Sequence, residues 1–300
     1  MRTTLVSFVL GALATGCIEG AEPEPMPAEL YGSCDAIRLY QVTAVQVPVN
    51  VEEAVDFGLD LDGDRLQDNT LGTTNVAINS VLAGRESDWA QRAIDDGRLT
   101  WFIEVESCDG YTRIGSHRGL AGGGMDSGGL RAVGVADAIP ADGEGFFPIS
   151  AFAELPGNAD NDVRWVRGLG LSANLRESGG VLQGSVGIGI TPANVRGVLL
   201  PTFAMGMSRI IRDTDGCPLA CPEDSDAWAL VELFDEDVDG VVTADELADN
   251  SIVGALSYPD VDLIGAYNGE PVYWPGHDQV ADHMSVGIGI EAVEISRQSF

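Results

Sequence analysis

Acidic side chains are concentrated in one short stretch near the C-terminal end of the chain. Residues 233–247 read LFDEDVDGVVTADEL, with an aspartate at every second position from Asp235 to Asp239, then a glycine, and later a closing Glu246. Carboxylates packed this closely repel one another. The stretch is therefore either a solvated acidic loop or the lining of a cation site.

The spacing of these residues matches the requirements of calcium. Calcium takes about six to eight oxygen ligands, and a loop can enclose it when ligands fall at positions 1, 3, 5, 7, 9 and 12. Counted in this way, the ligands are Asp235, Asp237, Asp239, Val241 through its carbonyl, Thr243 and Glu246. Gly240, at position 6, permits the sharp turn that such a loop needs. The spacing predicts a bound calcium ion.

The loop resembles that of the EF-hand family, whose members bind calcium between two helices. The preceding segment, DAWALVELF (226–234), has apolar Leu230, Val231 and Phe234 where the entering EF-hand helix has apolar residues. Ser225 can cap the start of this helix. The resemblance therefore implies a helix that leads directly into the loop.

The exit side of the loop departs from the family pattern. Leu247 fits it, but Asn250 and Ser251 stand where apolar residues belong, so we expect the exit helix to break and restart before IVGAL. The resemblance also implies that Val242, at position 8, can pair its backbone with a sister loop. We expect the complete EF-hand to span residues 225–257.

A second acidic segment, DLDGDRLQDN (60–69), has aspartates at positions 1, 3, 5 and 9. These residues are Asp60, Asp62, Asp64 and Asp68. The spacing resembles the calcium loops of dockerin and thrombospondin type 3 repeats. However, Arg65 replaces the turn glycine and Leu71 replaces the closing glutamate. Two interpretations stay open, a weaker variant calcium site and a solvated acidic turn.

No catalytic pattern is evident. His117, His277 and His283 are far apart in sequence and form neither an HExxH helix nor the order of a catalytic triad. The glycine-rich region 115–145 predicts long surface turns, and Ser127 within it lacks the glycine of a nucleophile elbow. We expect a protein that is not an enzyme.

Composition narrows the class of partner. The chain has 300 residues, of which 45% are apolar, and a formal net charge of −31 with no lysine. A field of this sign disfavours nucleic acid and anionic lipid surfaces and favours cations. An acidic, lysine-free surface is also compatible with adaptation to habitat or with codon usage, so the charge permits a calcium site without requiring one.

The first residues predict export. Residues 1–16 have one arginine, a short apolar run and then small residues, as a signal peptide does. The ATGC sequence that ends at Cys17 resembles a bacterial lipobox, which implies lipidation of Cys17, and residues 17–33 form a Pro- and Glu-rich tether. Ile18 after the cysteine implies an outer-membrane lipoprotein that faces the periplasm or the cell surface. Plain secretion is the alternative.

Four cysteines follow Cys17, and an exported protein meets oxidising conditions. They are Cys34, Cys108, Cys217 and Cys221. The short CPLAC spacing favours a local bridge between Cys217 and Cys221, which leaves Cys34 to pair with Cys108. Zinc ligation is the less favoured alternative, because the paired short gaps of a zinc knuckle are absent.

The remaining pattern predicts an α+β fold in which an antiparallel sheet or sandwich packs with helices. We expect helices at 71–84 and 86–97, a helical stretch that starts at Thr191-Pro192 and continues through 199–213, and strands at 37–49 and 99–107. Further strands are expected within 146–190. The hexapeptide SVGIGI occurs at 185–190 and again at 285–290, so these two strands are expected in one sheet with close packing on their glycines. We expect about six strands and four to six helices in a single domain over 34–300.

These observations together predict an exported, lipid-anchored calcium-binding protein in which the ion orders the EF-hand loop. The expected partners are calcium and, through the lipid anchor only, a membrane. A calcium-stabilised surface adhesin or assembly module is the main alternative, and a secreted hydrolase is a weaker one. The sequence does not indicate a protein partner.

Overall fold

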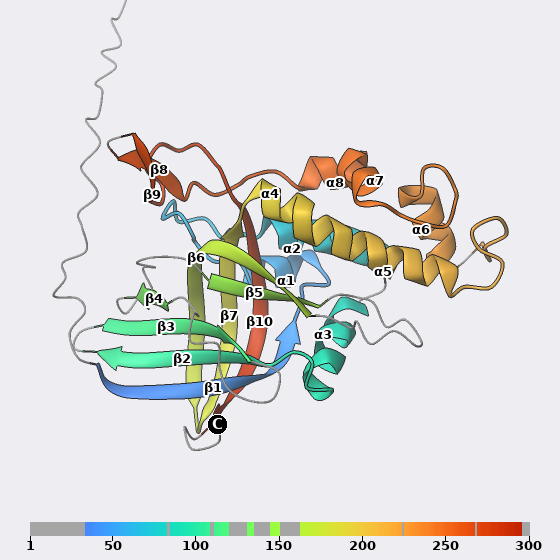
Figure 1. The fold of residues 1–300 in the computed structure, drawn as a ribbon. Helices are drawn as coiled ribbons and strands as arrows, with labels where there is room; N and C mark the ends of the chain where they lie inside the picture. Colours follow the sequence, from blue (N-terminus) through green and yellow to red (C-terminus); the bar gives the residue numbers. More distant parts are fainter. Residues whose placement is uncertain are drawn as a thin grey trace, which may run out of the picture.

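The fold is mixed α+β, as predicted (Figure 1). The computed structural model describes residues 34–82, 85–108, 111–119, 131–134, 145–150, 163–223, 225–267 and 269–295. The predicted signal peptide, the tether and Cys17 lie outside these residues. Within them, no helix is both long enough and apolar enough to cross a membrane.

One antiparallel sheet of eight strands is the base of the fold, in the order β4-β3-β2-β1-β10-β7-β6-β5. Its strands are β1 (Cys34–Gln46), β2 (Trp101–Cys108), β3 (Tyr111–Arg118), β4 (Arg131–Gly134), β5 (Gly145–Ser150), β6 (Val163–Ser178), β7 (Val181–Ile190) and β10 (Met284–Ile295). The sheet curves so that its two ends approach each other, since β5 contacts β3 and β4 contacts β6. A separate hairpin is formed by β8 (Ile264–Tyr267) and β9 (Glu270–Tyr273).

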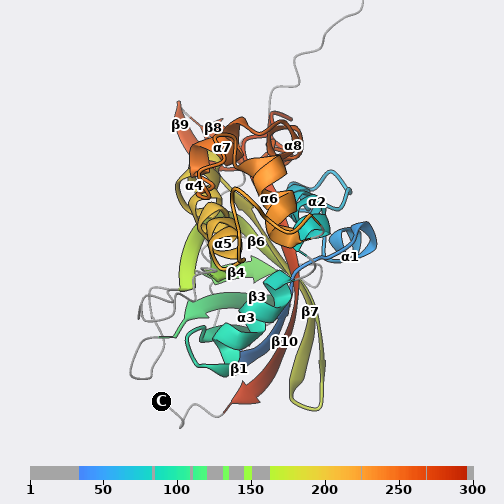
Figure 2. The ribbon, with the colours of Figure 1, turned by 90° about the vertical axis from the view of Figure 1, so that its right-hand side faces the viewer.

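The helices gather mainly at one end of this sheet (Figure 2). They are α1 (Val51–Asp56), α2 (Thr70–Leu82), α3 (Arg85–Asp95), α4 (Pro192–Asn194), the π-helical turn η2 (Val195–Leu199), α5 (Leu200–Arg212), α6 (Asp226–Phe234), α7 (Ala244–Asp249) and α8 (Ser251–Leu256). Helix α2 packs on β10, and α6 and α8 contact α2. Helix α3 packs separately on β1.

The two SVGIGI strands are direct neighbours, which confirms that they belong to one sheet. Strands β7 and β10 pair with Gly187 opposite Gly287. A Cβ atom on Gly287 would collide with the carbonyl oxygen of Phe57, and one on Gly189 would collide with the side chain of Leu263. The glycines therefore let two distant chain segments lie directly on the sheet.

Two apolar clusters stabilise the described part of the fold. The larger one joins the sheet to the helices and includes Trp101, Ile188, Met207 and Leu230. The smaller one consists of Leu61, Val261 and Leu263, with Leu59, Leu169 and Tyr273 packed against it. The smaller cluster joins the acidic segment 60–69 to the chain that precedes β8.

Most predicted elements are present within a few residues of their expected bounds. Helices α2, α3 and α5 correspond to the expected helices, and β1 and β2 to the first two expected strands. The sheet has more strands than expected. The prediction of surface turns throughout 115–145 is wrong for two described parts of this region. Strand β3 continues to Arg118 and buries Ser116 and His117, and β4 occupies Arg131–Gly134. The hydroxyl of Ser116 accepts a hydrogen bond from Trp101 Nε1 at 2.9 Å, so a polar residue occupies a core position there.

Candidate metal centre

The predicted helix–loop–helix is present near the C-terminal end. Helix α6 begins after Ser225, whose side chain accepts from the backbone N–H of Trp228, and ends at Phe234. The loop then leads into α7, which Thr243 caps. The expected break after α7 is also confirmed, because Asn250 ends α7 and its side chain caps α8.

The carboxylates of this loop converge. One oxygen each from Asp235, Asp237 and Asp239 lies within 4.8 Å of the others, a grouping that could hold a metal ion. Asp235 as a whole residue is only 2% exposed. Its two oxygens accept hydrogen bonds from the N–H groups of Asp239 (3.1 Å) and Gly240 (2.9 Å). The loop therefore wraps around its first carboxylate.

Two left-handed backbone positions produce this wrapping. Val238 has φ +57° and Gly240 has φ +88°. Only glycine adopts such a conformation at no steric cost. A Cβ atom on Gly240 would also lie 3.2 Å from Pro218, so this position tolerates little beyond glycine.

Glu246 joins the two ends of the loop. Its Oε2 accepts from the backbone N–H (2.7 Å) and the hydroxyl (2.8 Å) of Thr243. Its Oε1 accepts from the backbone N–H of Glu236 at 2.9 Å. Val241 and Thr243 are exposed on the loop. The residue predicted at position 12 thus lies over the beginning of the loop as well as its end.

The loop concentrates unfavourable negative charge. Burial raises the pKa of Asp235, the N–H groups of Gly240 and Asp239 lower it, and the nearby carboxylates of Asp239 and Glu246 raise it further. Burial also raises the pKa of Glu246, but hydrogen bonds from Thr243 and from the backbone of Glu236 and Asp237 outweigh that effect, so its pKa is lowered overall. A cation among these groups would relieve their mutual repulsion.

The apolar side of the helix–loop–helix is buried in the main core. Leu230, Phe234, Val242 and Leu247 all belong to that cluster. The hydroxyl of Ser208 in α5 donates to the carbonyl of Val242 at 3.0 Å. The residue expected to face a sister loop therefore bonds to α5 instead. A groove of about 600 Å³ runs between α5 and the loop.

A disulfide stands beside the loop. Cys217 and Cys221 are bonded, with a Cα–Cα distance of 4.3 Å, which confirms the predicted local bridge. Pro218, inside this bridge, is the residue that approaches Gly240. Cys34 lies opposite Cys108 in the β1–β2 backbone register, and their disulfide stays a prediction.

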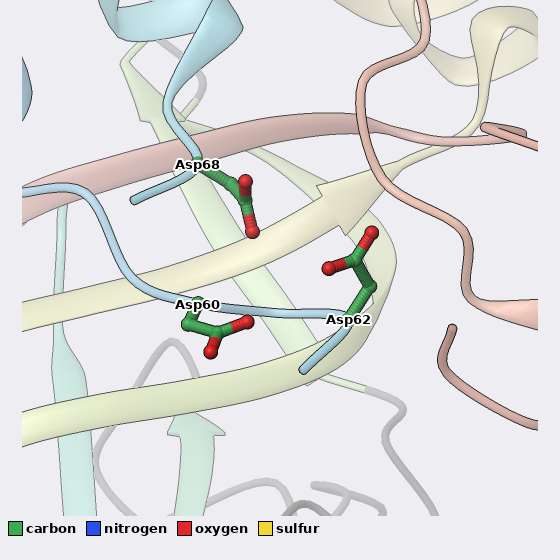
Figure 3. A group of neighbouring side chains, drawn as sticks. All are labelled: Asp60, Asp62 and Asp68. Atoms are coloured by element: carbon green, nitrogen blue, oxygen red, sulfur yellow. The ribbon is translucent and has the colours of Figure 1, made fainter. Parts of the chain in front are cut away.

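The second acidic loop also brings carboxylates together. One oxygen each from Asp60, Asp62 and Asp68 lies within 4.8 Å of the others. Figure 3 shows the carboxylates of Asp62 and Asp68 turned towards each other, with Asp60 on the same loop. The carboxylate of Asp64 is not in this group and accepts from the N–H of Leu66 at 2.7 Å.

The beginning of this loop has the same conformation as the beginning of the first. Gly63 and Arg65, at positions 4 and 6, have φ +84° and +73°. The N–H of Arg65 donates to Asp60 Oδ2 at 3.0 Å, as the N–H of Gly240 donates to Asp235 Oδ2 at 2.9 Å. Arginine at the turn position therefore does not prevent the turn, although a side chain in this conformation is strained.

Asp68 is the buried member of the second group, with 8% exposure. Burial raises its pKa to about 7, the N–H of Leu61 opposes this shift, and the carboxylates of Asp62, Asp260 and Asp64 add to it. Without a cation, this carboxyl group therefore retains a proton up to about neutral pH.

The histidines do not assemble a site among the described residues. His117 is buried in β3 at 3.8 Å from Glu104. His283 is also buried and bonds to Asp282 at 2.6 Å, and His277 stacks on Trp274. No histidine joins either described carboxylate group.

Comparison with known proteins adds no assignment. No protein-family model, curated protein or solved structure matches the chain. The two groups of three aspartates that could hold a metal ion are therefore the functional evidence that the described part of the molecule offers.

Proposed function

We propose that this protein is an exported, lipid-anchored calcium-binding protein in which one ion orders the 235–246 loop. The observation that carries the proposal is the convergence of the Asp235, Asp237 and Asp239 carboxylates on a loop that Glu246 closes. Val241, through its carbonyl, and Thr243 complete the proposed ligand set. Calcium would neutralise carboxylates that otherwise repel each other.

The donor chemistry favours calcium over other metals. All the proposed ligands are oxygen atoms, which suit hard cations, whereas zinc and copper favour sulfur or imidazole ligands. Magnesium demands a small octahedral shell and retains water, whereas a long flexible loop with a glutamate at position 12 suits the larger calcium ion.

A structural role fits this loop better than a sensor role. EF-hand sensors respond to calcium by opening an apolar groove. In this protein Leu230, Phe234 and Leu247 already belong to the main core, and Ser208 holds Val242 from the other side. Affinity at the weak end of the family, about 10⁻⁴ to 10⁻³ M, is enough for a site that faces extracytoplasmic calcium.

The expected location supports the same proposal. The Cys217–Cys221 disulfide fits an oxidising compartment. The leader sequence and the lipobox-like ATGC before the tether favour an outer-membrane lipoprotein. We propose a binding role and no catalytic role for the two aspartate groups, neither of which includes a histidine.

A calcium titration of two matched variants tests the proposal. Glu246→Gln removes the charge of the position-12 ligand and should weaken calcium binding at this loop roughly 100-fold, because this side chain is expected to supply two ligand oxygens. Glu236→Gln makes the same charge change at an exposed position outside the ligand set and should titrate like the wild type. Isothermal titration calorimetry measures both. Equal affinities in the two variants would refute the assignment.

A further inference from the structure

The second acidic loop lies against a distant part of the chain. The backbone N–H of Asp262 donates to Asp62 Oδ2 at 3.2 Å, across 200 positions of sequence. A Cβ atom on Gly276 would lie 2.6 Å from the carbonyl oxygen of Asp62. In Figure 1 the loop that follows α1 and the β8–β9 hairpin lie at the same end of the molecule.

Both segments alternate apolar and acidic residues. Leu61 in one segment, and Val261 and Leu263 in the other, form the small apolar cluster. Asp60 and Asp62 flank Leu61, just as Asp260 and Asp262 flank Val261. Because the apolar residues share one cluster, the two segments are held together with their acidic residues close by.

Asp262 has an unsatisfied oxygen in this arrangement. The residue is 3% exposed. Its Oδ2 accepts from the backbone N–H groups of Asp278 (2.9 Å) and Gln279 (2.7 Å), but its Oδ1 is buried without a hydrogen-bond partner. A buried carboxylate oxygen with no partner is costly unless a cation or a donor satisfies it.

Asp262 also lines a polar cavity of about 740 Å³ together with the acidic loop. The residues that line the cavity include four aspartates, namely Asp62, Asp64, Asp260 and Asp262. Asp260 is already committed, since its carboxylate accepts from both the backbone N–H and the hydroxyl of Ser285. Asp262 is the one of these four with a buried carboxylate oxygen that has no hydrogen-bond partner.

We propose that Asp262 completes a second calcium-class cation site with Asp60, Asp62 and Asp68. It supplies, from 200 positions away, the acidic ligand that the loop lacks at position 12, where Leu71 packs against the core. The ion links loop 60–68 to the chain that carries the β8–β9 hairpin. This inference rests on the proposed calcium chemistry but concerns a site with its own ligands. An experiment can therefore refute the Asp262 site without refuting the site in loop 235–246, and the reverse.

Calorimetric titration with calcium chloride on four full-length proteins tests the site. We expect two ions per chain in the wild type, one in Glu246→Gln, one in Asp262→Asn and none in the double variant. In Asp262→Asn the affinity of the second site should fall roughly 10- to 100-fold or more, because a charged ligand is lost. The Glu246→Gln result tests the first loop alone, and the Asp262→Asn result tests this inference alone.

Asp278→Asn is the matched control. The substitution makes the same charge change as Asp262→Asn, but at an exposed position in the chain that follows β9. It should bind two ions like the wild type. If Asp262→Asn also binds two ions with wild-type affinity, the inference is overturned. The amide oxygen introduced by Asp262→Asn can still accept the two backbone hydrogen bonds, so we expect the variant to fold. If circular dichroism shows that Asp262→Asn is unfolded, the titration is repeated with Asp60→Asn, which changes an exposed ligand of the loop. Binding of two ions with wild-type affinity by Asp60→Asn would then overturn the inference.

Limited proteolysis tests the link between the two segments. Chymotrypsin cleaves after aromatic residues, and Tyr258 and Trp274 flank the region that the ion would hold. Calcium should protect this region in the wild type and in Asp278→Asn but not in Asp262→Asn. Equal protection of all three proteins by calcium would contradict the proposed link.

Discussion

At the scale of single residues, Arg65 and Gly240 occupy equivalent turn positions with different side chains. Both have a left-handed backbone, with φ +73° and +88°. Such a conformation costs a non-glycine residue about 1 kcal/mol. The arginine also puts a positive charge on the loop that would hold the second ion. The second loop therefore combines backbone strain with charge repulsion of its ligand.

Replacing Arg65 should separate these two effects. Arg65→Gly removes both and should raise the free energy of unfolding by about 0.5–1 kcal/mol while tightening calcium binding at the second loop. Arg65→Ala removes the charge but retains the strained Cβ atom, so it should improve calcium binding without the gain in stability. Denaturant unfolding in chelator and calcium titration measure the two effects. Equal unfolding free energies for the two variants would contradict the strain argument.

Asp68 makes the stability of the ion-free protein depend on pH. Its pKa is about 7 in the folded chain against an ordinary value of 3.8, so the folded state binds the extra proton between these values. Its contribution to stability is therefore fully present below about pH 4 and is lost as the pH rises through about 7.

We expect ion-free protein to lose stability across this pH window, and Asp68→Asn to lose less because it has no proton to release. Urea unfolding in chelator at several pH values measures the difference. Parallel pH profiles for the wild type and the variant would show that Asp68 does not titrate as described.

At the scale of elements, the sequence predicted the helices and strands whose apolar residues recur in a regular pattern. Helix α5, which buries residues on more than one face, and strand β7, which buries a continuous run, are of this kind. Strand β3 was missed because it carries Gly115, Ser116 and His117 in its buried part. A strand whose interior face is polar offers no alternation to detect.

Of the two candidate metal sites, one could be predicted from the sequence and one ligand of the other could not. The 235–246 site could be predicted because all its proposed ligands lie in one short loop with a glycine turn. Asp262 could not be, because only tertiary packing of Val261 and Leu263 against Leu61 brings it to the second loop. The alternation in DVDL at 260–263, which resembles DLDG at 60–63, was the available signal.

At the scale of the whole molecule, both proposed ions act on one insertion. Strands β7 and β10 pair directly, yet residues 191–283 lie between them in sequence and contain α4 to α8 and the β8–β9 hairpin. One proposed ion lies within this insertion and the other joins it to loop 60–68. In a chain with a net charge of −31, removing both ions should therefore loosen the insertion before the sheet.

The most direct test of calcium binding is to strip the wild-type protein with chelator and restore calcium or magnesium. We predict heat of binding with calcium and a gain of about 2.7 kcal/mol in stability at a hundredfold excess over Kd. For a chain of this size, that gain corresponds to a rise in melting temperature of about 4 °C. Magnesium should give a smaller rise. No heat and an unchanged melting temperature on adding calcium would contradict the account.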